Sequence, residues 1–147
     1  MNQIGSVAVL GAGLMGSGIA QAAATAGHPT VVRDVDDAAL ARGRAAIEKS
    51  LARLVEKQKL EPAARDAALA RLRFTTELAP VAAADLVIEA VTEDVALKTS
   101  LFAALHPLAP AHVIFASNTS SLPIVTLATA SGRPDRFVGL HFFNPVP

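Results

Sequence analysis

The sequence of 147 residues contains no cysteine. Disulfides, thiolate metal sites and a cysteine nucleophile are therefore excluded, and the absence agrees with a reducing cytosol. Basic and acidic side chains number 13 each, so the formal net charge is zero and no nucleic-acid partner is expected. The four histidines lack the local spacing of a zinc motif, so we predict no metal site; they are His28, His106, His112 and His141.

Long apolar runs are missing as well. The N-terminus has no basic segment, and its apolar start is interrupted by glycines after a few residues. We therefore expect neither a signal peptide nor a membrane span, and a cytoplasmic protein without a membrane partner. The length fits one domain, which buries about two-thirds of the surface of its unfolded chain. No internal repeat or low-complexity linker is visible.

One stretch carries most of the functional information. The apolar run Ser6–Leu10 leads directly into Gly11-Ala12-Gly13-Leu14-Met15-Gly16 and then into an alanine-rich helix. In this context Gly-x-Gly-x-x-Gly indicates a dinucleotide site: Gly11 permits the tight turn, Gly13 lets the backbone approach a pyrophosphate, and Gly16 lets helix and strand pack closely. The N–H groups and the positive dipole end of the helix would face the phosphates. The alternative is a helix start whose small residues serve packing alone.

An acidic residue falls where a dinucleotide site needs one. Asp34 ends the apolar run Thr30–Asp34, 23 positions after Gly11, near the expected offset of about 20. Its carboxylate can hydrogen-bond the adenosine ribose and would repel a 2′-phosphate, which predicts NAD over NADP. Two alternatives stay open: Arg33 could accommodate that phosphate, and Asp34 could simply cap a helix starting near Asp36-Asp37-Ala38.

Short β-branched runs alternate with alanine- and leucine-rich stretches of helical length. This alternation is typical of parallel strands joined by right-handed helical crossovers. The sequence predicts an α/β fold of the Rossmann type, a doubly wound, mainly parallel sheet with helices on both faces. The predicted strands are Val7–Leu10, Thr30–Asp34, Phe74–Thr75, Leu86–Ala90, Val113–Ala116 and Phe137–Leu140. The predicted helices are 14–26, closed by Gly27, a helix over 38–60, one restarting at Pro62, one near Asp94 and one begun by Pro123.

The predicted helix 38–60 has an apolar face and a basic face. Its apolar face, at helical spacing, consists of Leu40, Ile47, Leu51 and Leu54. Its other face has four more basic than acidic residues: Arg42, Arg44, Lys49, Arg53, Lys57 and Lys59 against Glu48 and Glu56. A solvated helix surface explains this excess, and a site for a phosphorylated ligand tail is the alternative.

Ligands of an open parallel sheet bind beyond the carboxyl ends of its strands. Glu93 and Lys98 follow one predicted strand, and the hydroxyl-rich run Ser117–Ser121 follows the next. Each has a structural alternative: Ser120 or Ser121 could cap the helix begun by Pro123, and Lys98 could pair with Asp94 four residues before it.

His141 lies at the end of the last predicted strand, three residues before Asn144. A histidine there can accept a proton near neutral pH, and the amide could orient its ring or the substrate. A satisfied structural histidine is the alternative.

Three motifs occur along the chain in an order and at separations that match those of a known family: Gly11–Gly16, Ser117-Asn118-Thr119-Ser120-Ser121 and Gly139-Leu140-His141-Phe142-Phe143-Asn144-Pro145. Together they closely resemble the L-3-hydroxyacyl-CoA dehydrogenase family over essentially the whole chain, and the last motif is much more specific than the glycine loop. Because no hydratase domain precedes the cofactor domain, the chain looks most like the stand-alone 3-hydroxybutyryl-CoA dehydrogenases. The resemblance implies NAD-dependent oxidation of a short-chain L-3-hydroxyacyl-CoA to the 3-ketoacyl-CoA, as in fatty acid β-oxidation.

The resemblance also implies roles for the reacting groups. His141 would take the 3-hydroxyl proton as hydride leaves C3, Ser120 would hydrogen-bond the same oxygen, and Asn144 would be a supporting amide. The glycine loop, Leu14 and Met15 included, would bind NAD.

Further ligand contacts follow from the same resemblance. Asp34 matches the carboxylate that binds the ribose, and Glu93 and Lys98 match positions near the nicotinamide end of NAD. Ser50 and Lys57 correspond to positions that contact coenzyme A, which favours a phosphate-binding role for the basic helix face.

The chain departs from the family pattern at its end. It stops at Pro147, whereas the family continues into a carboxylate that pairs with the histidine and then into an all-helical domain. We therefore expect residues 1–147 to be the NAD-binding domain alone, weakly active or inactive by itself, and a homodimer when the helical domain is present. The competing hypotheses are a dehydrogenase of free hydroxy acids, of the gulonate or carnitine type, and a non-catalytic NAD-binding or structural protein.

Overall fold

Six parallel strands form one sheet in the order β3-β2-β1-β4-β5-β6. The strands are β1 (Val7–Leu10), β2 (Thr30–Arg33), β3 (Leu72–Thr75), β4 (Leu86–Glu89), β5 (Ile114–Ser117) and β6 (Phe137–Gly139). The strand order reverses between β1 and β4, and this reversal is where doubly wound sheets bind dinucleotides. The computed structural model, which describes residues 3–147, thus confirms the predicted Rossmann-type fold.

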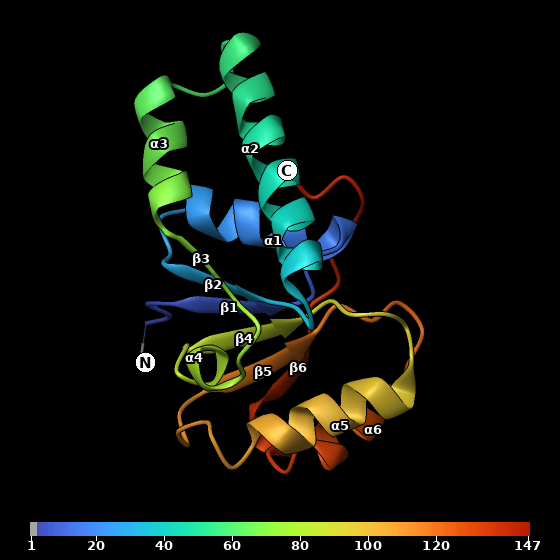
Figure 1. Ribbon diagram of the computed structural model, residues 1–147. Helices are drawn as coiled ribbons and strands as arrows, with labels where there is room; N and C mark the ends of the chain where they lie inside the picture. Colours follow the sequence, from blue (N-terminus) through green and yellow to red (C-terminus); the bar gives the residue numbers. More distant parts are fainter. Residues whose placement is uncertain (1–2) are drawn as a thin grey trace.

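Helices cover both faces of the sheet (Figure 1). They are α1 (Leu14–Thr25), α2 (Asp37–Glu56), α3 (Pro62–Ala70), α4 (Ala79–Ala82), α5 (Val95–Leu105) and α6 (Ile124–Ala130), with a short 3₁₀ turn over Pro134–Arg136. In Figure 1, α1, α2 and α3 lie above the sheet, and α4, α5 and α6 lie below it. Among residues 3–147 no helix combines the length and the apolar character that crossing a membrane demands.

The element boundaries differ from the predictions by small amounts. Predicted strand ends at Asp34, Ala90 and Leu140 are one residue too long, and β5 is shifted by one residue so that it includes Ser117. The basic helix is shorter than predicted, because Gln58 adopts a positive φ of 56°. The N–H of Lys59 then bonds back to the Leu54 carbonyl at 2.9 Å, which closes the helix end.

The core has two parts, one on each side of the sheet. Along β1, Val7 and Val9 face the cluster under α1–α3, whereas Ala8 and Leu10 face the cluster under α4–α6. Because both faces of β1 are buried, all four of its residues are apolar. The predicted apolar face of α2 belongs to the first cluster: Leu40, Ile47 and Leu51 are buried and Leu54 packs beside them.

Candidate active site

The glycine loop joins β1 to α1 at the carboxyl edge of the sheet. Gly11 has φ +103°, and a β-carbon there would lie 2.7 Å from the Ala90 carbonyl oxygen. A β-carbon at Gly16 would overlap the Gly11 carbonyl oxygen, whereas one at Gly13 would meet no atom within 4 Å. The packing of the protein itself therefore requires Gly11 and Gly16, and it leaves the space at Gly13 open for a ligand at the start of α1.

Gly43 is a further tight contact, and the sequence reasoning missed it. It lies on α2, where a β-carbon would come within 2.8 Å of the Ala12 carbonyl oxygen and 3.1 Å of Ser17 Oγ. Ser17 in turn donates a hydrogen bond to the Ala12 carbonyl at 2.9 Å. The signal was a glycine inside a helical stretch, which often marks close packing. Through Gly43, α2 supports the glycine loop from outside.

Asp34 follows β2 and is fixed beside the glycine loop. Its Oδ2 accepts a hydrogen bond from Ala12 N at 2.7 Å, and its Oδ1 accepts one from Val35 N at 2.7 Å. The capping alternative is wrong, because Asp36 is the N-cap of α2 and accepts from Ala39 N at 2.7 Å. The half-buried carboxylate thus lies where the ribose of a bound dinucleotide is expected.

The Arg33 side chain is bound to the protein backbone. Its Nε donates a hydrogen bond to the Thr76 carbonyl at 3.0 Å, which holds the guanidinium against the chain that follows β3. The alternative in which Arg33 binds a 2′-phosphate therefore has less support than the one in which Asp34 binds the ribose.

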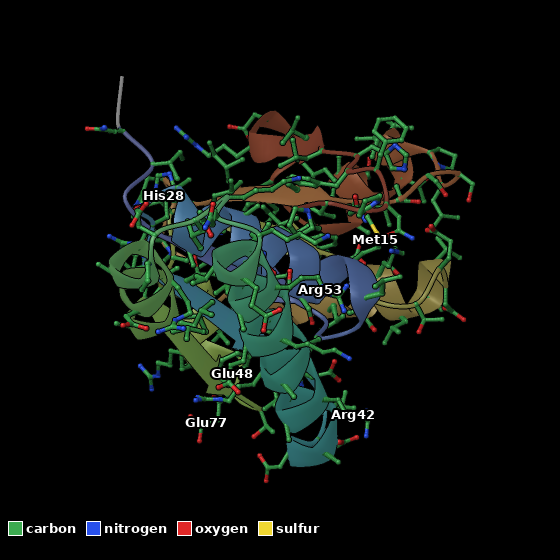
Figure 2. The ribbon with its side chains drawn as sticks, turned by 90° about the horizontal axis from the view of Figure 1, so that it is seen from above. Met15, His28, Arg42, Glu48, Arg53 and Glu77 are labelled. Carbon is green, nitrogen blue, oxygen red and sulfur yellow. The ribbon has the colours of Figure 1, made fainter. Side chains whose placement is uncertain are left out.

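A cavity of about 320 Å³ gathers six of the predicted site residues from distant parts of the chain. The predicted residues in its wall are Met15, Glu93, Lys98, Ser120, His141 and Asn144, and Ala90, Val91, Asn118, Phe142 and Phe143 complete it. Figure 2 shows Met15, from the glycine loop, beside the C-terminal segment of the chain. The cavity thus joins the predicted cofactor loop to the predicted reacting groups.

His141 is exposed in this cavity. Its ring packs edge-on against Phe143, with centroids 4.8 Å apart and planes at 71°. The backbone beside it is anchored, since Phe142 N donates to Asn118 Oδ1 at 2.7 Å. Within residues 3–147 no hydrogen bond joins Asn144 to the His141 ring, so the amide lines the cavity without orienting the imidazole.

The loop after β5 is held by Thr119. Its hydroxyl donates to Glu93 Oε1 at 2.6 Å and accepts from Leu122 N at 3.0 Å. Neither Ser120 nor Ser121 caps α6, whose N-cap is Pro123 without a side-chain hydrogen bond. The capping alternative for these serines is therefore wrong, and Ser120 lines the cavity.

A buried ion pair joins Lys98 of the cavity wall to Glu89. Lys98 Nζ lies 2.6 Å from Glu89 Oε1 and 3.5 Å from Glu93 Oε1. The alternative that pairs Lys98 with Asp94 is wrong, because Asp94 caps α5 through Leu97 N at 2.8 Å. The sequence reasoning missed Glu89, although a lone carboxylate inside an apolar strand signals a buried partner.

The charge of Glu93 is favoured by its neighbours. Burial by itself raises the pKa of this carboxyl, but the hydrogen bond from Thr119 and the positive charge of Lys98 outweigh burial and hold the pKa below its ordinary value. The wall of the cavity therefore presents an ionised carboxylate at neutral pH.

Two further cavities continue from the first along α2. One of about 520 Å³ lies between the glycine loop, α2 and the C-terminal segment, and one of about 370 Å³ lies farther along α2. Both are lined by Ala46, Ser50 and Arg53, and Lys57 lines the third cavity, the one of about 370 Å³. The predicted pair Ser50 and Lys57 thus meets in one basic cavity. Figure 2 labels Arg42 and Arg53, which mark two positions along α2 beside this path.

Residues 6–147 match the family described as 3-hydroxyacyl-CoA dehydrogenase, NAD binding domain. The chain belongs to this family. NAD is therefore the cofactor of this type of domain, as Asp34 predicted, and the resemblance found in the three motifs is confirmed.

Relatives of this family member are named as dehydrogenases. The chain is 52% identical over 139 residues to a probable 3-hydroxybutyryl-CoA dehydrogenase of Deinococcus radiodurans. The matched region covers 95% of this chain and 50% of the relative. It is 48% identical over 142 residues to a 3-hydroxybutyryl-CoA dehydrogenase of Mycobacterium tuberculosis, with coverage of 96% and 50%. The chain therefore spans about half the length of the curated relatives it matches.

A solved structure agrees with the fold and the family. The crystal structure of (S)-3-hydroxybutyryl-CoA dehydrogenase PaaH1 from Ralstonia eutropha matches with a TM-score of 0.95 and 46% identity, covering 99% of this chain and 51% of that one. At this similarity the two chains share one backbone fold.

Proposed function

We propose that this chain is the NAD-binding domain of an enzyme that oxidises a short-chain L-3-hydroxyacyl-CoA, such as 3-hydroxybutyryl-CoA, to the 3-ketoacyl-CoA. The observation that carries the proposal is the cavity where Met15 of the glycine loop meets Ser120 and His141. A cofactor loop and a proton acceptor in one cavity are what a hydride-transfer reaction requires.

The residues at the carboxyl edge fit NAD. The open space at Gly13 and the start of α1 suit a pyrophosphate, and the Asp34 carboxylate suits the ribose hydroxyls. Met15, Glu93 and Lys98 then lie where the cavity would receive the nicotinamide end. When bound, NAD supplies the acceptor for the hydride that leaves C3.

The chain itself supplies the proton chemistry. A neutral ring nitrogen of His141 would take the proton of the 3-hydroxyl while the C3–H bond breaks, so that the C–O bond becomes a carbonyl. The Ser120 hydroxyl would hydrogen-bond the same oxygen and fix its place. Asn144, in the same cavity wall, would bind the acyl part of the substrate.

The basic cavities along α2 support a coenzyme A ester as the substrate. Asn144 lines both the first and the second cavity, and Ser50 and Arg53 line both the second and the third. This series connects the reacting centre to the cations Lys49, Lys57 and Lys59, which suit the phosphates of coenzyme A. A free hydroxy acid would leave this path unused.

A direct comparison of ligands tests the proposal. With NADH present, calorimetry of the chain should show binding of acetoacetyl-CoA and much weaker binding of free acetoacetate. Equal affinities would favour the free-acid alternative, and binding of NADH with neither ligand would favour a non-catalytic protein. The homodimer, the helical domain beyond Pro147 and the cytoplasmic location stay predictions.

A further inference from the structure

A cluster of three charges at the cavity wall has no part in the proton chemistry above. We call Glu89, Glu93 and Lys98 the carboxylate–lysine cluster. Glu89 is completely buried and Lys98 is 1% exposed, whereas the Glu93 side chain is 41% exposed and reaches the cavity. The Lys98 ammonium lies between the two carboxylates, at 2.6 Å from Glu89 and 3.5 Å from Glu93.

Hydrogen-bond donors surround both carboxylates. Glu89 Oε1 accepts from Lys98 Nζ and from Val91 N at 2.7 Å, and its Oε2 accepts from Ser117 Oγ at 2.6 Å. Glu93 accepts from Thr119 Oγ1 at 2.6 Å. Two carboxylates thus share one ammonium, and the cluster carries one net negative charge.

Glu89 fixes the position of the Lys98 ammonium and so determines which carboxylate is less neutralised. It ties the end of β4 to α5 through Lys98 and to the end of β5 through Ser117. Because Glu89 holds the ammonium at the shorter distance, the carboxylate left less compensated is Glu93, the one that faces the cavity.

We propose that the carboxylate–lysine cluster shifts the relative affinity of this domain from NADH toward oxidised NAD⁺, with Glu89 as the residue that positions the Lys98 charge. The nicotinamide ring is a cation when oxidised and neutral when reduced, so a nearby net negative charge stabilises only the oxidised form. This inference rests on the proposed function, since it needs the nicotinamide end to lie at Glu93 and Lys98.

The test is the ratio of the dissociation constants of NADH and NAD⁺, measured by calorimetry on the 147-residue chain at pH 8.5. Glu89→Gln removes one negative charge and should lower the ratio about tenfold, the size expected for a unit charge roughly 10 Å away at an effective dielectric constant of about 20. Lys98→Met removes the positive charge and should raise the ratio by a similar factor.

The matched control is Glu48→Gln, the same chemical change at an exposed position on α2. Figure 2 shows Glu48 on the side of α2 away from Met15, and its variant should leave the ratio unchanged. The double variant Glu89→Gln/Lys98→Met restores one negative charge at Glu93 and should return the ratio toward that of the wild type.

Opposite shifts in the two single variants support the electrostatic role, because a purely structural defect weakens both cofactor forms alike. Equal weakening of NAD⁺ and NADH, with an unchanged ratio, would overturn the inference while leaving NAD binding intact. If Glu89→Gln does not fold, Glu93→Gln removes the same charge from a partly exposed side chain, and an unchanged ratio there would be equally decisive against it. A wild-type chain that binds neither form would refute the proposed function itself.

Discussion

Replacing Gly13 or Gly16 with alanine is predicted to have different effects on the free energy of unfolding. Gly13→Ala adds a methyl group where no protein atom lies within 4 Å, and φ at this position is −72°. The free energy of unfolding should therefore change by less than about 1 kcal/mol, the usual scale of an N-cap change. Gly16→Ala pushes its methyl group into the Gly11 carbonyl oxygen and should cost about 3 kcal/mol or more, because backbone must move to relieve the overlap.

Cofactor binding separates the two glycines further. The Gly13→Ala methyl group occupies the space of the pyrophosphate and would break one or two charge-assisted hydrogen bonds, each worth about 1.5–3 kcal/mol. A combined loss of about 2–4 kcal/mol corresponds to a dissociation constant for NAD⁺ roughly 30- to 1,000-fold higher. The loss should be similar for NADP⁺, since both cofactors share the pyrophosphate.

Urea unfolding and calorimetry on the same samples check both parts. The expected result is a Gly13→Ala protein that is as stable as the wild type and binds NAD⁺ poorly. Normal NAD⁺ affinity in this variant would refute the placement of the pyrophosphate at Gly13. Unfolding of Gly13→Ala would show instead that the open space at this glycine has a structural role.

Three further results are expected. Asp34→Ala should lower the preference for NAD⁺ over NADP⁺ at least about tenfold in calorimetry, because the ribose loses its charged partner, and equal wild-type affinities would remove Asp34 from this role. Lys57→Ala should weaken acetoacetyl-CoA binding at low salt but not NAD⁺ binding, while Arg136→Ala, on another surface, serves as the control; an unchanged affinity returns the basic face to a solvated surface. Hydrogen bonds from Gly5 N and the Ser6 hydroxyl lower the pKa of Asp85. The stability that these hydrogen bonds provide is present above the ordinary pKa near 3.8 and is lost as the pH falls through the lower pKa of the folded state. Below about pH 4, the free energy of unfolding measured in urea should therefore fall more steeply with decreasing pH in the wild type than in Asp85→Asn. Identical pH profiles of the two proteins would contradict this.

The sheet and its edge were predictable because their signals are local. An apolar run followed by the glycine loop specifies β1, the turn and α1, and β-branched runs mark the other strands. Since parallel strands end at one edge of a sheet, the positions of Glu93, Ser120 and His141 after three such strands also predicted that these side chains lie near one another.

The buried ion pair was not predictable in the same way. Glu89 lies inside an apolar strand, and its partner Lys98 is nine residues later on α5. Helical spacing favoured Asp94 as the partner of Lys98, but Asp94 is used by the helix N-terminus. Only the packing of α5 against the end of β4 brings the ammonium to Glu89, and periodicity does not encode that packing.

The capping alternatives failed for a related reason. A sequence offers several side chains that could cap a helix, and the backbone path decides among them. Asp36 caps α2 in place of Asp34, and Pro123 begins α6 without help from Ser120 or Ser121. Asp34 and Ser120 are thereby left at the carboxyl edge for ligand contacts.

The most direct test is the oxidation of NADH by acetoacetyl-CoA, followed at 340 nm, with His141 intact and replaced by glutamine. The protein to use is this chain joined to the second half of a 3-hydroxybutyryl-CoA dehydrogenase relative, and the chain alone is expected to be at least ~100-fold slower. His141→Gln should lower kcat by about 10²- to 10⁴-fold, the contribution of a general base, while the dissociation constant of NADH stays within about twofold. A variant with wild-type kcat would contradict the assignment of His141 as the proton acceptor and, with it, the proposed mechanism.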